Sequence, residues 1–160
     1  MGKEKGRLKG LSFSSWLAGW LAGWLACMQA LAAAGSAVQL VMQCRSDGQV
    51  IGTVLLFKWD EGSARLELGY VLGRAHWRRG CAREALQAVC DQAFGALGLR
   101  RIQAEVQLDN AASNAPLRAL GFVHEGTLRQ RWVARQRACD THVYGLLAHE
   151  WLPLSAAGRL

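Results

Sequence analysis

Residues 69–86 constrain the fold of this chain more than any other segment. They have the pattern of an apolar strand, a short loop rich in Arg and Gly, and a helix that begins on Cys81 and Ala82. The N-terminus of a helix carries unpaired N–H groups and a positive partial charge, so it attracts an anion such as a phosphate. Gly80 allows the backbone to approach such a ligand closely. The pattern therefore predicts a strand–loop–helix site for a phosphorylated ligand.

The arginines near this segment strengthen the prediction, although a capped surface helix with solvated arginines is the alternative interpretation. The chain has a net charge of +7, which suits an acidic or phosphorylated partner. The arginines form separate groups at 74–83, 100–101 and 129–137, and two of these groups adjoin the predicted site. No nucleic-acid-binding motif accompanies them, so nucleic acid is not expected to be a partner.

Length and composition indicate one globular domain. With 160 residues, of which 51% are apolar and 19% charged, the chain can bury a sizeable core. The five cysteines show no metal-site spacing, and their odd number argues against a disulfide framework. We therefore expect reduced thiols, no metal and a cytoplasmic location. The expected organisation is a basic tail over 1–10, a single domain over 11–151 and a C-terminal tail over 152–160.

The uncharged segment 11–43 allows three interpretations. It contains a tandem Trp-Leu-Ala repeat over 16–27, which at helical spacing places the Trp and Leu side chains on one face. We favour an amphipathic core helix over 11–34, because the remaining chain needs a partner helix. The second interpretation is a signal peptide with a basic start and an Ala-rich cleavage region. The third is a membrane span with Gly19-x-x-x-Gly23 as its helix contact.

Hydrophobic periodicity predicts strands and helices along the rest of the chain. The order indicates a mixed α/β sheet whose strands splay where the central loop binds its ligand. The expected strands are 37–44, 50–59, 65–72, 101–108, 122–123, 128–134 and 142–147, with a turn or bulge at 135–141. The expected helices are 81–97, which ends at Gly98, and a short helix up to Leu120. The apolar face expected for the first helix consists of Ala85, Ala88, Val89, Ala93 and Leu97.

Several motifs resemble, in the right order, those of the GNAT N-acetyltransferases. Glu-Leu-Gly-Tyr-Val-Leu at 67–72 is followed by the loop and helix at 76–86, and Leu-Gly-Leu-Arg-Arg-Ile stands at 97–102. Asn-x-x-Ser-Asn at 110–114 then leads to Leu-Gly-Phe at 120–122. Together they resemble the branch that contains the ribosomal-protein N-terminal (alanine/serine) acetyltransferases. The resemblance implies the GNAT fold, an α/β (α+β) arrangement with a mixed, mostly antiparallel central sheet that is splayed at the acetyl-CoA site and flanked by helices.

The resemblance implies where acetyl-CoA binds. Backbone groups at the end of strand 65–72 would pair with the pantetheine arm, as an added strand pairs with a sheet edge. The N–H groups of the loop 78–82, with Arg83 at the start of the helix, would hold the pyrophosphate. The superfamily usually has Gln or Arg where this chain has Trp77, although Trp is common in this branch. The residues expected to bind the cofactor are Tyr70, Val71, Leu72, Trp77, Arg78, Arg79, Gly80, Cys81, Ala82, Arg83, Asn110 and Ser113.

The resemblance also implies direct attack of the acceptor amine on the thioester in a ternary complex. Catalysis then depends on positioning, on deprotonation of the ammonium group and on polarisation of the thioester carbonyl by a backbone N–H near Val71. Glu67 is either the base, acting through water, or a carboxylate on the solvent face of its strand. Ser113 either returns a proton to the leaving thiolate or caps its helix. Some members of the branch use a Glu where this chain has Trp132, so that base cannot be carried over.

Four other side chains have a structural interpretation beside a catalytic one. Glu125 is either a contact of the acceptor amine or an exposed turn carboxylate. Tyr144 is either a phenol near the sulfur or a core residue. His76 and His142 are either bases or structural histidines.

The expected function is transfer of the acetyl group of acetyl-CoA to an amine, with the α-amine of a protein N-terminus as the acceptor. The first alternative is a small-molecule amine, although a polyamine pocket needs more Asp and Glu than this chain has. The second is a non-catalytic acyl-CoA-binding protein with a degenerate N-terminal lobe, since the family's first strand and helix are hard to find before Trp16. A third is a membrane-attached form held by 11–34. We expect a monomer or homodimer that is not bound to a membrane.

Overall fold

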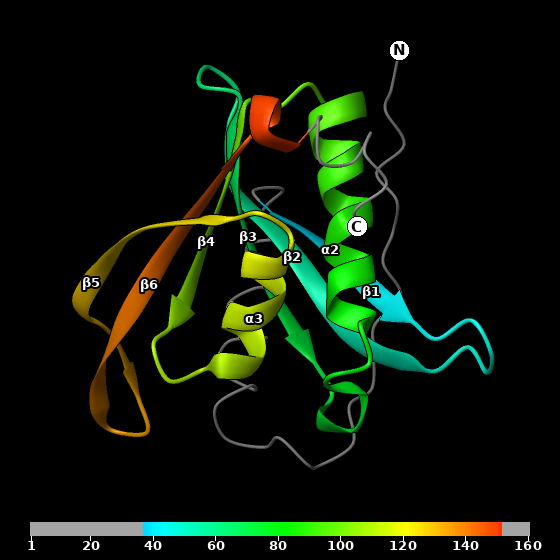
Figure 1. Cartoon of the computed structure of the whole chain (residues 1–160), viewed down its shortest axis with the longest axis horizontal. Helices are drawn as coiled ribbons and strands as arrows, with labels where there is room; N and C mark the ends of the chain where they lie inside the picture. The colour runs from blue at the N-terminus through cyan, green and yellow to red at the C-terminus, as the bar shows by residue number, and fades with distance from the viewer. Residues whose placement is uncertain (1–36, 152–160) are drawn as a thin grey trace.

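The computed structural model describes residues 37–151, so the predictions for 1–10, 11–34 and 152–160 lie outside the described part. Its strands and helices follow one another in the order expected for the resemblance (Figure 1). The strands are β1 (Ala37–Gln43), β2 (Val50–Asp60), β3 (Arg65–Leu72), β4 (Arg101–Gln107), β5 (Val123–Ala134) and β6 (Arg137–Leu147). The helical elements are η1 (Arg74–His76), α2 (Cys81–Asp91), η2 (Gln92–Ala96) and α3 (Ala111–Ala119).

The six strands form one mixed sheet with the order β1-β2-β3-β4-β6-β5. In the described sheet β3 and β4 are the only parallel neighbours, and every other pair is antiparallel. The pairing of β3 with β4 ends at Leu68 and Ala104, although β3 continues to Leu72 and β4 to Gln107. The two strands diverge from there (Figure 1). This confirms the prediction of a mixed, mostly antiparallel sheet that is splayed in its centre.

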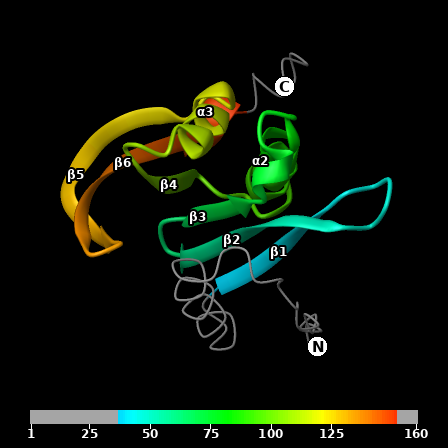
Figure 2. The same ribbon diagram turned by 90° about the horizontal axis from the view of Figure 1, so that it is seen from below.

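Helices α2 and α3 lie on the same side of the sheet (Figure 2) and bury the core against it. The predicted apolar face of α2 is wrong in part, because Ala88 and Leu97 are exposed. The wide π turn η2 follows the α-helix at once and changes the angular spacing of the later residues. No helix within residues 37–151 is long and apolar enough to cross a membrane. The residues buried from α2 and η2 are Ala82, Leu86, Cys90, Ala93 and Phe94.

Strands β5 and β6 form one long hairpin, whose turn lies inside the predicted turn or bulge at 135–141 but is much shorter than that range. The turn consists of Arg135 and Gln136, both with a left-handed φ, and β6 begins at the next residue. Strand β5 contains two irregularities, between His124 and Gly126 and between Leu128 and Trp132. Most of β5 is exposed, so its sequence lacks the apolar alternation that marks a half-buried strand.

Candidate active site

The carboxyl ends of β3 and β4 form the frame of the candidate site. Both α2 and α3 begin at this edge, where the two strands part (Figure 2). Open α/β sheets bind ligands in crevices of this kind. Leu68 and Ala104 belong to the core under the helices, and side chains alternate between the two faces of a sheet. Glu67 and Glu105 therefore lie on the opposite face, on the other side of the opening from the helices.

The loop before α2 has the geometry of an anion site. Gly80 is the N-cap residue with a φ of 79°, and Arg78 also has a left-handed φ of 59°. Turns of this kind bring successive N–H groups onto one anion. A Cβ at Gly80 would meet no heavy atom within 4 Å, so the helix start is open to a ligand. Arg78 and Arg79 are exposed and have no ion-pair partner among residues 37–151, whereas Ala82 is buried.

The end of β3 presents unpaired backbone groups to the opening. The Leu72 carbonyl accepts a hydrogen bond from the indole N–H of Trp77 at 2.8 Å, and the following residue donates to β2 instead. Peptide groups alternate in direction along a paired strand. Those of Tyr70 therefore point away from β2 into the opening, whereas those of Val71 point toward β2. Of the three residues predicted for the pantetheine arm, Tyr70 has the most accessible peptide groups, because the Leu72 carbonyl already accepts the hydrogen bond from Trp77.

The side chain of Tyr70 crosses the opening and joins β3 to α3. Its hydroxyl donates to the Ser113 carbonyl at 2.5 Å, and burial raises the pKa of Tyr70 above its ordinary value. Asn110 is the N-cap of α3, and its Oδ1 accepts from the Ser113 N–H at 3.1 Å. The interpretation of Ser113 as the cap is therefore wrong, because Ser113 lies inside the first turn and Asn110 precedes it. Contacts of Asn110 and Ser113 with the cofactor stay predictions.

A buried polar network that motif reasoning missed supports this helix. The Tyr144 hydroxyl donates to Asn114 Oδ1 at 2.8 Å and accepts from Arg118 Nε at 3.1 Å. Asn114 Nδ2 donates to the carbonyls of Gln107 and Asn110 at 3.0 and 2.8 Å. Tyr144 is fully buried, as its core interpretation predicted. The network fixes the loop between β4 and α3, which borders the opening. The Asn that follows Ser113 in the motif was its only sequence signal.

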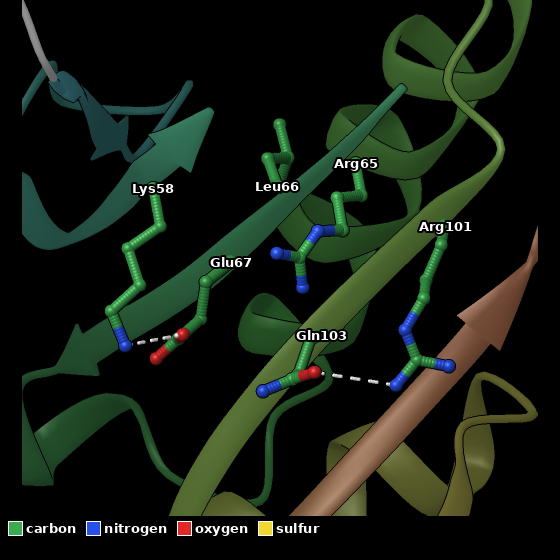
Figure 3. Close-up of a pocket in the computed structure, with 6 residues that line it drawn as sticks. All are labelled: Lys58, Arg65, Leu66, Glu67, Arg101 and Gln103. Atoms are coloured by element: carbon green, nitrogen blue, oxygen red, sulfur yellow. Dashed lines mark hydrogen bonds and ion pairs between the residues drawn. The ribbon is translucent and has the colours of Figure 1, made fainter. Parts of the chain in front are cut away.

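Glu67 is buried on the face opposite the helices. Glu67 is only 6% exposed, so the interpretation of this side chain as a carboxylate on the solvent face of β3 is wrong. Lys58 Nζ donates to Glu67 Oε2 at 2.7 Å (Figure 3). Burial raises the pKa of Glu67, and the hydrogen bond from Lys58 opposes that shift. A hollow of about 50 Å³ adjoins the pair and is also lined by Arg65, Arg101 and Gln103.

Glu105 is a second carboxylate of this face, and the sequence interpretation did not single it out. Its side chain is 7% exposed and accepts from Arg131 Nε at 3.1 Å and from a terminal guanidinium nitrogen at 3.3 Å. The β5 irregularity between Leu128 and Trp132 contains Arg131, and bulges of this kind re-aim side chains. Glu105 follows Ala104, the last residue of β4 that pairs with β3, so it lies where these two strands part. An acidic residue at an alternating strand position was its only sequence signal.

The remaining candidates lie farther along the same sheet. Arg101 donates to Glu125, and this hydrogen bond lowers the pKa of that carboxyl. His142 lies on the side of the sheet that carries the helices, and its Nδ1 shares a hydrogen bond with Thr127 Oγ1 at 3.1 Å. Its pKa is lowered by burial and, to a smaller extent, by His124 and Arg118. Trp132 is 49% exposed and does not lie at the opening, where a base would have to stand. Within residues 37–151 no group of three or more His, Cys, Asp or Glu side chains is arranged to hold a metal ion.

We expect Glu67→Gln to raise the free energy of unfolding at neutral pH, by up to about 1 kcal/mol, because it removes a buried charge whose pKa is raised. The folded protein binds the Glu67 proton more tightly than the unfolded chain does. The ionised group therefore costs stability above its folded pKa, and the cost disappears as the pH falls toward 4.5. Urea unfolding at about pH 7.5 and pH 4.5 measures the gain, which should shrink at the lower pH.

Glu125→Gln is the matched variant, and we expect it to change the free energy of unfolding in the opposite direction. Because Arg101 lowers the pKa of Glu125, this carboxylate stabilises the fold above its unfolded pKa, and its loss should lower stability at neutral pH. Equal destabilisation by both substitutions would contradict the burial account of Glu67.

The geometry separates two kinds of chemistry across one opening. The positive loop and the free peptide groups of Tyr70 suit an extended, phosphorylated ligand that enters between β3 and β4. The buried carboxylates of Glu67 and Glu105 suit an amine that approaches from the opposite face. A phosphorylated donor and an amine acceptor would then meet where the strands part.

Comparison with known proteins agrees with this geometry. Residues 13–123 match the family described as Acetyltransferase (GNAT) domain. The uncharacterized N-acetyltransferase p20 of Bacillus licheniformis is 37% identical over 121 residues, which cover 76% of this chain and 68% of p20. Mycobacterium smegmatis RimJ in complex with CoA-disulfide has a TM-score of 0.72 and 28% identity, covering 87% of this chain and 68% of RimJ. The Vibrio fischeri ribosomal-protein-S5-alanine acetyltransferase has a TM-score of 0.69 and 25% identity, covering 83% and 73% of the two chains.

The splayed sheet, the anion loop before α2 and the sequence match point to the same family. The matched residues 13–123 make up more than half of the 160 residues. The chain therefore belongs to the GNAT family of acetyl-CoA-dependent N-acetyltransferases and is an acyltransferase of that family.

Proposed function

We propose that this protein transfers the acetyl group of acetyl-CoA to the α-amine of a protein or peptide N-terminus. The observation that carries the proposal is the opening between β3 and β4, which has an anion loop on one side and two carboxylate side chains less than 10% exposed on the other. The names of ribosomal-protein acetyltransferases among similar structures support the acceptor class. Direct transfer needs both partners at one opening, and this arrangement would bring them there.

The donor side is built from backbone groups. The N–H groups of the loop 78–82, with Arg78, Arg79 and Arg83 nearby, would hold the pyrophosphate. The peptide groups of Tyr70 would pair with the pantetheine arm, and the Tyr70 N–H is the better donor for the thioester carbonyl because Val71 points toward β2. When bound, acetyl-CoA supplies the activated acetyl group.

On the acceptor side Glu105 is the proposed base. Glu105 takes one proton from the α-ammonium group, directly or through water, and the free amine nitrogen then forms a bond to the acetyl carbon as the carbon–sulfur bond breaks. The Ser113 hydroxyl remains the proposed donor to the leaving thiolate, and it regains its proton from the nitrogen that has been acetylated. An α-amine has a pKa of about 8, against about 10.4 for a Lys side chain. A carboxylate base therefore removes the proton of an α-ammonium group at a lower cost.

Two alternatives are less well supported. A polyamine acceptor needs carboxylates with unbalanced charge, but both Glu67 and Glu105 already have a cationic partner. A non-catalytic protein was suggested by Trp132 at the place of the Glu used in some relatives and by the N-terminal lobe, which lies outside the described residues. Glu105 provides a carboxylate at the opening from a different strand, so Trp132 does not leave the site without a base.

The test is acetylation of a matched peptide set by the full chain with acetyl-CoA. We expect kcat/KM for a peptide with a free N-terminus to exceed that for the same peptide with a blocked N-terminus and an internal Lys by at least about 10-fold near pH 7.5. Thiol release measures the rate, and mass spectrometry locates the acetyl group. Preferred acetylation of spermidine would support the polyamine alternative. Tight acetyl-CoA binding without turnover of any amine would support the non-catalytic one.

A further inference from the structure

The acceptor face of the sheet, defined here by Lys58, Glu67, Glu105 and Arg131, carries balanced charge. Both carboxylates of this face have a cation within ion-pair distance, so the face itself carries no acidic surplus to attract a polycation. The partners nearest the opening are Lys58 for Glu67 and Arg131 for Glu105 (the first of these pairs is drawn in Figure 3). The pairs farther from it are Arg65 with Asp60 and Arg101 with Glu125.

The two partners of the Glu105–Arg131 pair differ in their freedom to move. The Arg131 side chain is 39% exposed, whereas that of Glu105 is 7% exposed. The Gln130 N–H donates to Asp140 Oδ1 at 2.8 Å, which holds the bulge that aims Arg131 at the face. The guanidinium is therefore the partner that can turn toward solvent at the lower cost, because it is already partly hydrated.

A buried hydroxyl near this pair also has no partner. Thr141 is 1% exposed, and its Oγ1 makes no hydrogen bond within residues 37–151. The register pairs Glu105 with Val143, so Thr141 occupies the diagonal position on the same face. A polar group left unpaired in this way fits a site that is completed by a ligand.

We infer that Arg131 is the residue that selects the acceptor, and that it binds a carboxylate close to the acceptor amine. This inference rests on the proposed function. In the structure Arg131 donates hydrogen bonds to both carboxylate oxygens of Glu105. An incoming ammonium group needs the same carboxylate. The ammonium group takes the place of the guanidinium, and the released Arg131 pairs with the carboxylate of the acceptor. An acceptor with an ammonium group and a nearby carboxylate pairs with both Glu105 and Arg131. An acceptor without the carboxylate leaves Arg131 unpaired, and a polyamine brings further cations in its place.

The acceptor class is therefore an amine with a carboxylate a few atoms away. An N-terminal peptide with Asp or Glu in its next positions has this chemistry, and so does a free acidic amino acid. The first matched pair of probes is Ala-Asp-Glu against Ala-Asn-Gln at the start of one otherwise identical peptide. The second pair is free glutamate against glutamine amide, which keeps the α-amine but has no carboxylate, and this pair separates a free amino acid from a peptide.

The test compares the ratio of kcat/KM within each pair for the wild type, Arg131→Gln and Arg131→Glu. We expect the wild type to prefer the acidic member of at least one pair by about 10-fold, Arg131→Gln to bring the ratio near 1, and Arg131→Glu to invert it. Arg131→Lys should restore much of the preference. If Arg131 only held Glu105 in place, its variants would lower the rate equally for both members, and the unchanged ratio would overturn the inference.

Arg137→Glu is the matched control on the same hairpin, because Arg137 is exposed and has no ion pair within the described residues. Its ratio should stay at the wild-type value, and an equal loss there would reduce the effect to general surface charge and overturn the inference. Peptide binding in the presence of CoA is measured in parallel. If no probe is acetylated, the proposed function fails, but an acidic preference in binding that depends on Arg131 still supports the inference, and its absence overturns it.

Discussion

Replacing Gly80 by Glu is expected to weaken acetyl-CoA binding by at least about 100-fold, equivalent to roughly 3 kcal/mol. The carboxylate would stand at the N-terminus of α2, where it repels the pyrophosphate and competes for the same N–H groups. A Cβ at this position would meet no heavy atom within 4 Å, so we expect the loss of affinity to come from the ligand site rather than from a packing clash. Isothermal titration with acetyl-CoA and a thermal unfolding curve measure the two separately.

Gly98→Glu is the matched control for this substitution. Gly98 also has a left-handed φ, of 62°, and open space around its Cβ position, but it lies past the other end of the helix. Both variants therefore carry the same backbone strain and the same added charge, and Gly98→Glu should keep the wild-type affinity. Equal affinities of the two variants would show that the pyrophosphate does not bind at Gly80.

Glu105→Gln is expected to lower kcat by about 10²- to 10⁴-fold, the usual contribution of a general base. The amide keeps the shape of the carboxylate and can still meet Arg131, but it does not accept the amine proton. Acetyl-CoA affinity should stay unchanged, because the donor site is built from the loop 78–82 and β3 on the other side of the opening. Single-turnover rates with a preformed acetyl-CoA complex measure the chemical step.

The comparison variant is Glu125→Gln, which also removes a carboxylate from an arginine pair on the same sheet but two strands away from the opening. It should change kcat by less than about 3-fold, a small effect beside that of a general base. If Glu67→Gln lowered kcat as strongly as expected for Glu105→Gln, and Glu105→Gln did not, the base would be Glu67, as the sequence interpretation proposed.

Local patterns predicted the regular elements well. Strand β3 has the predicted bounds, and β1, β2 and β4 differ from them by one residue at one end. Apolar residues alternate along β4, and β2 is an apolar run bounded by turn residues, so both have a clear strand signal. The hairpin of β5 and β6 was predicted less well, since its strands are exposed and their polar residues conceal the alternation. The helix 81–97 was predicted as one continuous α-helix, but it changes to a π turn after Asp91. That change depends on packing, which periodicity does not describe.

The candidate site divides in the same way. The donor loop was predicted because its parts are neighbours in the sequence: a strand end, a glycine with a left-handed φ and a helix start. Glu105, Arg131 and the Tyr144 network were missed because their partners are 26 and 30 residues apart and meet only through strand pairing. Ser113 and Asn110 were predicted together, but only the structure shows which of them caps the helix.

The sequence alone determined the family, the position of the anion loop and the order of the elements, because each of these depends on residues close together in the chain. Only the tertiary structure decided that Glu67 is buried, that the peptide groups of Tyr70 rather than Val71 face the opening, and that Arg131 occupies Glu105. Burial, backbone direction and charge pairing are properties of residues brought together by the sheet. They depend on register and on a bulge in β5, and neither is written in any single segment of the chain.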